Sequence, residues 1–135
     1  MHKLWPIEPA IATALILFSA PIHELGHYIT AKIFNLNPSM HTGLVSGYVL
    51  RDPGTPLQDF IVSVSGGLLE SVYLVAMSRI FSNQFAKYLL QSAAIIKMSY
   101  ALTEALDKTN LVKLGLAMAL IYFMFRFMGV VRDGV

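Results

Sequence analysis

The chain has 135 residues, of which 56% are hydrophobic and 13% are charged, and its formal net charge at pH 7 is +2. Soluble domains usually carry about a quarter charged residues, so this composition and the mean hydropathy of +0.61 favour a chain that lies in a lipid bilayer. The basic residues are scattered, which argues against a nucleic-acid-binding stripe, and the lack of cysteine excludes disulfides and thiolate metal sites.

The length permits one domain, residues 1–135. Four apolar segments lie near or above the roughly 20 residues that span a bilayer, and they cover residues 7–36, 57–81, 85–106 and 111–131. Lipid offers the main chain no hydrogen-bonding partners, so spanning segments of this kind are helices. We therefore predict an all-α integral membrane protein with about four transmembrane helices, located in the cell membrane.

The first apolar segment contains an unusual group of polar residues, His23-Glu24-Leu25-Gly26-His27. On a helix His23 and His27 lie one turn apart on one face, so both rings can bind one ion. Glu24 is about 60° from His27 around the helix axis, close enough to reach a water at the metal. Ionisable side chains are costly at membrane depth, so this pattern indicates a zinc site with Glu24 as general base.

Proline and asparagine mark the limits of this first helix. Pro21 lies just before the histidines, and because proline lacks a main-chain donor we expect a kink beside the site. Asn35, Asn37 and Pro38 are expected to end the segment.

Residues 39–50 break the helical period, because Gly43 and Gly47 separate short β-prone stretches. We predict a small β-hairpin or an edge strand after the first helix. An unwound stretch of substrate would pair with this strand by β-addition, and the residues predicted to do so are Leu44, Val45, Tyr48 and Val49.

The second apolar segment begins with a helix-start signature. Thr55-Pro56-Leu57-Gln58 resembles a capping box with proline at the first helical position. Further along, the small residues between Ser63 and Gly67 permit close contact between helices.

The third zinc ligand is open from the residues alone. A catalytic zinc usually takes three protein ligands and a water, and Glu70, Glu104 and Asp107 are the acidic candidates in or beside the later segments. Glu104 has an alternative role as the partner of Lys97, seven residues earlier and nearly on the same helix face. Asp107, at the end of a segment, taken alone is expected to be a solvated helix-end residue.

The sequence HELGHYITAKIF resembles the first core helix of the site-2 protease family of intramembrane zinc metallopeptidases, in which a small residue, here Ala31, follows the motif. The short β region at residues 39–50 also matches that family. Ser65-Gly66-Gly67-Leu68-Leu69-Glu70 aligns with the family's Ala-Gly-Pro-x-x-Asn, and Ser99 through Lys108 aligns with its Asn-x-x-Pro-x-x-x-Leu-Asp-Gly. The resemblance covers about residues 10–110. It departs where Glu70 replaces Asn, where the proline before Leu-Asp is missing, and where Lys108 replaces Gly.

This resemblance implies an endopeptidase that cleaves membrane proteins, or transmembrane peptides, within or near their membrane-spanning segments in the lipid bilayer. It implies that Zn²⁺ is held by His23, His27 and Asp107, with Glu24 as the base. Glu70, Glu104 and Lys97 remain as alternative ligands or as residues that support the ligands. No oligomeric state is indicated.

Two other functions are compatible with the chain. One is a catalytically inactive, zinc-binding membrane subunit or helix chaperone of the same fold, although a purely structural site needs no base at Glu24. The other is a small membrane transporter or metal-handling protein, which fits Lys97 and Glu104 within a span. This second alternative does not explain a glutamate next to His23.

Overall fold

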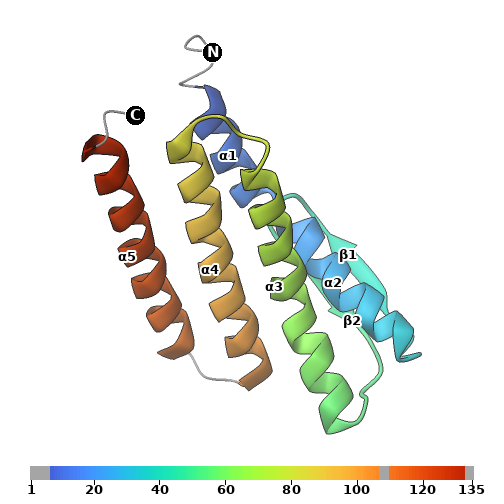
Figure 1. The fold of residues 1–135 in the computed structure, drawn as a ribbon. Coiled ribbons are helices and arrows are strands. Elements are labelled where there is room, and N and C mark those ends of the chain that lie inside the picture. Colours follow the sequence, from blue (N-terminus) through green and yellow to red (C-terminus); the bar gives the residue numbers. More distant parts are fainter. Residues whose placement is uncertain (1–6, 107–109, 133–135) are drawn as a thin grey trace.

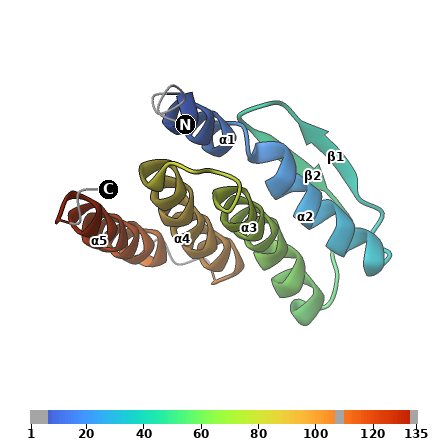
Figure 2. The same cartoon turned by 45° about the horizontal axis from the view of Figure 1, so that its top comes forward.

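The computed structural model describes residues 7–106 and 110–132 of the chain, and this part is mostly helical with one small antiparallel hairpin. Helices α2 to α5 lie side by side in a row in which α3 separates α2 from α4, while the hairpin packs on α2 and α1 packs mainly against α4 (Figures 1 and 2). In chain order the elements are α1 (Ile7–Leu17), α2 (Ala20–Ile33), β1 (Ser39–Thr42), β2 (Gly47–Leu50), α3 (Pro56–Ser78), α4 (Gln84–Leu106) and α5 (Asn110–Arg132).

The first apolar segment is broken into two helices, as predicted from its proline. Helix α1 ends at Leu17, α2 begins at Ala20, and their axes are bent by 40°. Pro21 lies in the first turn of α2, where its missing N–H costs little because the first donors of any helix lack an intrahelical partner. The bend sets α2, which carries both histidines, alongside the first half of α3 (Figure 1).

Small residues bring the three central helices together, as predicted for the run from Ser63 to Gly67. A Cβ atom on Gly26 of α2 would lie 2.5 Å from the carbonyl oxygen of Ser65, and one on Gly67 would lie 2.5 Å from the Cβ of Ala101. Both helix crossings therefore require glycine. At the other end of the bundle α1, α3 and α4 share a buried apolar cluster of Ala12, Leu74, Ala86, Leu90, Ala93 and Ala94.

The predicted capping box starts α3. The Thr55 hydroxyl accepts a hydrogen bond from the main-chain nitrogen of Gln58 at 3.3 Å, and the Gln58 side chain accepts one from the main-chain nitrogen of Thr55 at 2.9 Å. Pro56 is the first helical residue. The sequence signature therefore fixes where α3 begins and where the loop from β2 ends.

The predicted hairpin is confirmed. Strands β1 and β2 are antiparallel, with Met40 opposite Val49 and His41 opposite Tyr48. The main-chain nitrogen of Gly43 donates to the carbonyl oxygen of Ser46 at 2.8 Å and closes the turn.

The predicted limits of the pairing strand need correction. Leu44 and Val45 lie in the turn between the strands, and only Tyr48 and Val49 of the predicted residues belong to a strand. The first strand lies earlier, at Ser39–Thr42, because the bonded pair of Gly43 and Ser46 places the apolar dipeptide at the tip. At the tip Leu44 is 67% exposed and Val45 68% exposed.

Fewer helices than predicted have the length and apolar composition of a membrane span. Within the described residues α3 meets this test alone, and α1 with α2 meets it if the bent pair counts as one span. Helix α4 carries Lys87, Lys97 and Glu104, which lower its hydropathy, and the apolar stretch of α5 from Leu114 to Arg126 is shorter than a span. The expectation of about four spans is therefore supported for at most two segments.

Candidate metal centre

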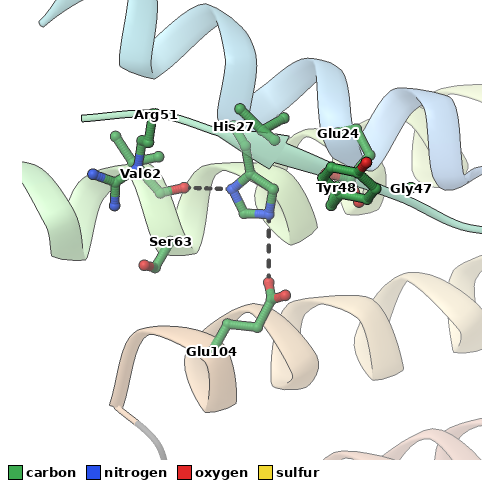
Figure 3. A pocket seen from close by; sticks show the side chains of 9 residues that line it. Glu24, His27, Gly47, Tyr48, Arg51, Val62, Ser63 and Glu104 are labelled. Carbon is green, nitrogen blue, oxygen red and sulfur yellow. Dashed lines mark hydrogen bonds and ion pairs between the residues drawn. The ribbon is translucent and has the colours of Figure 1, made fainter. Parts of the chain in front are cut away.

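Three side chains from two helices converge beside α3. His23 and His27 lie one turn apart on α2, and Glu104 comes from the last turn of α4. Figure 3 shows the ring of His27 facing the carboxylate of Glu104. The Nε2 atoms of the two histidines are 3.1 Å apart. The Oε2 atom of Glu104 is 3.4 Å from the Nε2 of His23 and 3.6 Å from the Nε2 of His27. Within the described residues, these three side chains form a group whose ligand atoms lie close enough together to hold one metal ion.

The spacing of these three atoms fits tetrahedral zinc. Zinc lies about 2.0–2.2 Å from nitrogen and oxygen ligands, so two ligand atoms of a tetrahedral site are about 3.3–3.6 Å apart. The three observed distances, 3.1, 3.4 and 3.6 Å, lie around this value. These three side chains would hold the ion, and a catalytic zinc with three protein ligands keeps a fourth position for water or substrate.

The other nitrogen of each imidazole ring is already bonded. The Nδ1 of His27 donates to the carbonyl oxygen of Val62 at 2.6 Å, and the Nδ1 of His23 donates to the Oε2 of Glu70 at 2.9 Å. In the neutral form of each ring, Nε2 therefore carries a lone pair that faces the other ring and the carboxylate of Glu104. Three acceptors in contact repel one another unless a metal ion or a shared proton lies between them, and the nitrogen and oxygen donor set is one that zinc takes.

Gly66 of α3 makes room for the ring of His27. A Cβ atom at this position would lie 2.4 Å from the Nε2 of His27, the atom that faces the metal position. The main chain of α3 therefore acts as one wall of the site, and Gly66 lets this wall approach the ring.

We predict that Gly66→Ala lowers zinc affinity by about 5–150-fold, because overpacking of this size costs about 1–3 kcal/mol and the strain falls on the ring of His27. The measurement is a competition titration of zinc against a chromophoric chelator. Gly129→Ala is the matched control, since a Cβ atom at that position meets nothing within 4 Å. An unchanged affinity in Gly66→Ala would contradict this role for α3.

The predicted general base lies between two cavities. Glu24 is 8% exposed, and strand β2 covers it so closely that a Cβ atom on Gly47 would lie 2.8 Å from its Cγ. A cavity of about 420 Å³ is lined by Glu24, His27, Gly47, Tyr48, Val49, Arg51, Val62, Ser63 and Glu104 (Figure 3). A second, of about 330 Å³, is lined by Ala20, His23, Glu24, Val45, Ser46, Gly47, Glu70, Lys97, Tyr100 and Glu104.

The structure distinguishes two of the three acidic candidates for the third ligand. The Glu104 carboxylate faces both Nε2 atoms, whereas Glu70 bonds the Nδ1 of His23, on the opposite edge of the ring from the metal position. Glu70 therefore orients the ring of His23 and does not face an ion that Nε2 would bind. Asp107, the ligand implied by the family resemblance, lies outside the described residues, so its role stays a prediction.

Of the two roles considered for Glu104, the structure does not show the ion pair with Lys97. The Nζ of Lys97 is 2.8 Å from the Oε1 of Glu70. Seven residues of helix separate Lys97 from Glu104 by about 10 Å along the axis, and Glu70 of the neighbouring helix is closer. The carboxylate of Glu104 instead faces the two histidines, and the Tyr100 hydroxyl also bonds to it.

Sequence reasoning missed two side chains of the cavities. Tyr100 lies one turn before Glu104 on α4, lines the second cavity, and has its ring centroid 5.8 Å from that of His23. Tyr100 and Glu104 are four residues apart and share a helix face, so Tyr100 could be placed at the site only if Glu104 were already known to face it. Arg51 lines the first cavity and is paired with Asp59. Nothing in the sequence marks Arg51 as part of the site.

No family model, curated protein or solved structure matches the chain. The resemblance to site-2 proteases therefore rests on the motifs alone.

Proposed function

We propose that the protein is a zinc endopeptidase of the site-2 protease type, which cleaves membrane proteins within or near their transmembrane segments. The observation that carries this proposal is the convergence of His23, His27 and Glu104 at the spacing of zinc ligands. Glu24 lies beside them, and cavities open on two sides of the site. A peptide that is cut at a metal needs room on both sides of the scissile bond, and these two cavities provide it.

The chemistry follows from the placement of Glu24. Zinc, when bound, polarises the scissile carbonyl and makes the attacking water more acidic. Glu24 takes the proton from that water and returns it to the leaving amine. The low exposure of Glu24 under β2 keeps the carboxylate out of bulk water and directs it into the space shared by both cavities.

A location in the bilayer is part of the proposal. It is supported by the high hydropathy of the chain and by the apolar composition of α3. Large apolar side chains are exposed along the helices, as expected for a lipid-facing surface. On α3 they include Leu68, Val72 and Val75, and on α5 they include Leu114, Leu116, Met118, Leu120, Ile121, Met124 and Phe125.

Among residues 7–106 and 110–132, no strand pairs with the second edge of β2, and this edge is available to an extended substrate. The main-chain groups of a strand in an antiparallel pair alternate between facing the partner strand and facing away. Gly43 and Ser46 form a bonded pair, so Tyr48 faces β1, whereas the main-chain groups of Gly47 and Val49 point away from it. β2 also lines the first cavity. We therefore propose that an unwound substrate segment pairs with this edge by β-addition.

Removing one outward donor tests this edge. Val49→Pro should lower the rate of cleavage about fivefold or more, because a hydrogen bond in a desolvated interface contributes about 1 kcal/mol. Proline is tolerated where the strand N–H faces away from the partner, so zinc content should not change. Val49→Thr keeps the N–H and similar size, and should keep the rate. Equal rates in the proline and threonine variants would remove the β-addition proposal.

The proposed function is tested on the full chain in proteoliposomes. We expect about one zinc per chain by elemental analysis, cleavage of single-span substrates, and loss of cleavage on chelation with recovery after zinc is returned. Stoichiometric zinc without cleavage of any substrate would favour the inactive zinc-binding subunit. Absence of zinc from undamaged protein would refute the metallopeptidase and would point to a proton shared between the imidazoles and Glu104.

A further inference from the structure

Glu70 is a buried carboxylate that belongs to a different helix from all of its partners. Its side chain is 1% exposed, and it accepts hydrogen bonds from the Ser19 hydroxyl, from the Nδ1 of His23 at 2.9 Å and from the Nζ of Lys97 at 2.8 Å. Glu70 lies on α3 and Lys97 lies on α4. Ser19 is the N-cap residue of α2, and His23 lies in the first turns of that helix. One carboxylate thus joins the two helices that carry the histidines and Glu104.

The charge of Glu70 requires a partner. A buried carboxylate is strongly destabilising when it is left unpaired, and Lys97 supplies the cation from the edge of the second cavity, with its side chain 31% exposed. The opposite charges of Glu70 and Lys97 cancel. The two negative charges of Glu24 and Glu104 would then match the two positive charges of a divalent ion, so that the whole group would carry no net charge.

The direction of the hydrogen bond to His23 matters for metal binding. A carboxylate that accepts from Nδ1 fixes the proton on that nitrogen, holds the plane of the ring, and makes Nε2 a better donor to a metal. His27 donates its equivalent bond to the carbonyl oxygen of Val62, which has no charge to balance. The two ligand rings are therefore supported in different ways, and only that of His23 depends on an ion pair.

We propose that Glu70 and Lys97 act together as a positioning pair for His23, an inference that rests on the proposed zinc site. Glu70 orients the imidazole, and Lys97 holds and neutralises Glu70. Zinc affinity then depends on the pair as a unit, so the effects of removing either member are not additive.

The test compares zinc affinities of the full chain in detergent micelles, for wild type, Glu70→Gln, Lys97→Met and the double variant. We expect Glu70→Gln to bind zinc about 10–100-fold more weakly, the usual effect of removing the carboxylate behind a ligand histidine. Lys97→Met should lose affinity as well. The double variant should be no weaker than Glu70→Gln, because a neutral amide needs no cation.

The absorption spectrum of the Co²⁺-substituted protein gives a second readout, since it reports the geometry and donor strength of the ligands. Glu70→Gln should shift this spectrum, whereas Lys97→Arg, which keeps the cation, should retain both the spectrum and the zinc affinity of wild type. Glu8→Gln is the matched carboxylate control, because Glu8 accepts from the main-chain nitrogen of Asn83 on the far side of the bundle. Lys32→Met is the control for an exposed lysine.

Each outcome decides for or against the pair. Wild-type affinity and spectrum in Glu70→Gln, or purely additive losses in the double variant, would overturn the inference while leaving the endopeptidase proposal intact. If Glu70→Gln does not fold, the inference is decided by Lys97→Met against Lys97→Arg, and equal affinities in these two would overturn it. A wild-type protein that binds zinc but cleaves nothing would refute only the endopeptidase, and one that takes up no zinc would refute both.

Discussion

Glu24→Gln should abolish peptide hydrolysis and leave zinc bound. An amide cannot take the proton of the attacking water, and a positioned general base contributes about 10²–10⁴-fold to the rate. We therefore expect at least a 100-fold fall in the rate of cleavage of a single-span substrate in proteoliposomes. The substitution has nearly the same shape, and Glu24 is not one of the three groups at the metal position, so zinc content by elemental analysis should equal that of wild type.

Glu8→Gln is the control for this prediction, because it makes the same chemical change on α1, where the carboxylate accepts from the main chain of Asn83. A fully active Glu24→Gln variant would show that another group moves the proton. Loss of both zinc and activity would mean instead that Glu24 is a ligand.

The part of the site that lies within one helix could be predicted from the sequence. A spacing of four residues places His23 and His27 on one face of any helix, whatever the rest of the fold does. The kink before α2 is equally local, because Pro21 lacks a main-chain donor wherever the helix packs. The structure confirms both features.

The third member of the site could not be predicted, because it depends on how helices pack. The sequence alone does not distinguish Glu70, Glu104 and Asp107, because each is an acidic residue in or beside an apolar segment. The crossing of α2 over α3 is set by the contact of Gly26 with Ser65, and that of α3 over α4 by the contact of Gly67 with Ala101. These contacts turn Glu70 toward the Nδ1 of His23 and Glu104 toward Nε2.

The partner of Lys97 could not be predicted for the same reason. Spacing within one helix suggested Glu104, but the closest carboxylate belongs to α3. The hairpin shows a related limit: its glycines mark a turn, whereas β1 has four exposed residues with no apolar alternation to reveal the strand.

Glu104→Ala should remove zinc from the protein, and cleavage with it. The carboxylate of Glu104 is the acidic group that faces both Nε2 atoms within the described residues, at 3.4 and 3.6 Å. Loss of a ligand leaves two protein donors where a catalytic zinc takes three. We expect affinity to fall more than about 100-fold, beyond the 10–100-fold typical of residues that only support a ligand. A competition titration with a strong chelator measures this difference.

Asp107→Ala is the informative comparison, because the resemblance to site-2 proteases implies that Asp107 is the ligand. If Glu104 holds the metal, Asp107→Ala keeps stoichiometric zinc, and Glu104→Asp recovers part of the affinity because it restores a carboxylate on a shorter side chain. The reverse result, with zinc lost only in Asp107→Ala, would assign the metal to the family's position. The Glu104 carboxylate would then be a hydrogen-bonding partner of the histidines. Loss of zinc in both variants would indicate that both carboxylates bind one ion. The fourth coordination position of zinc permits this.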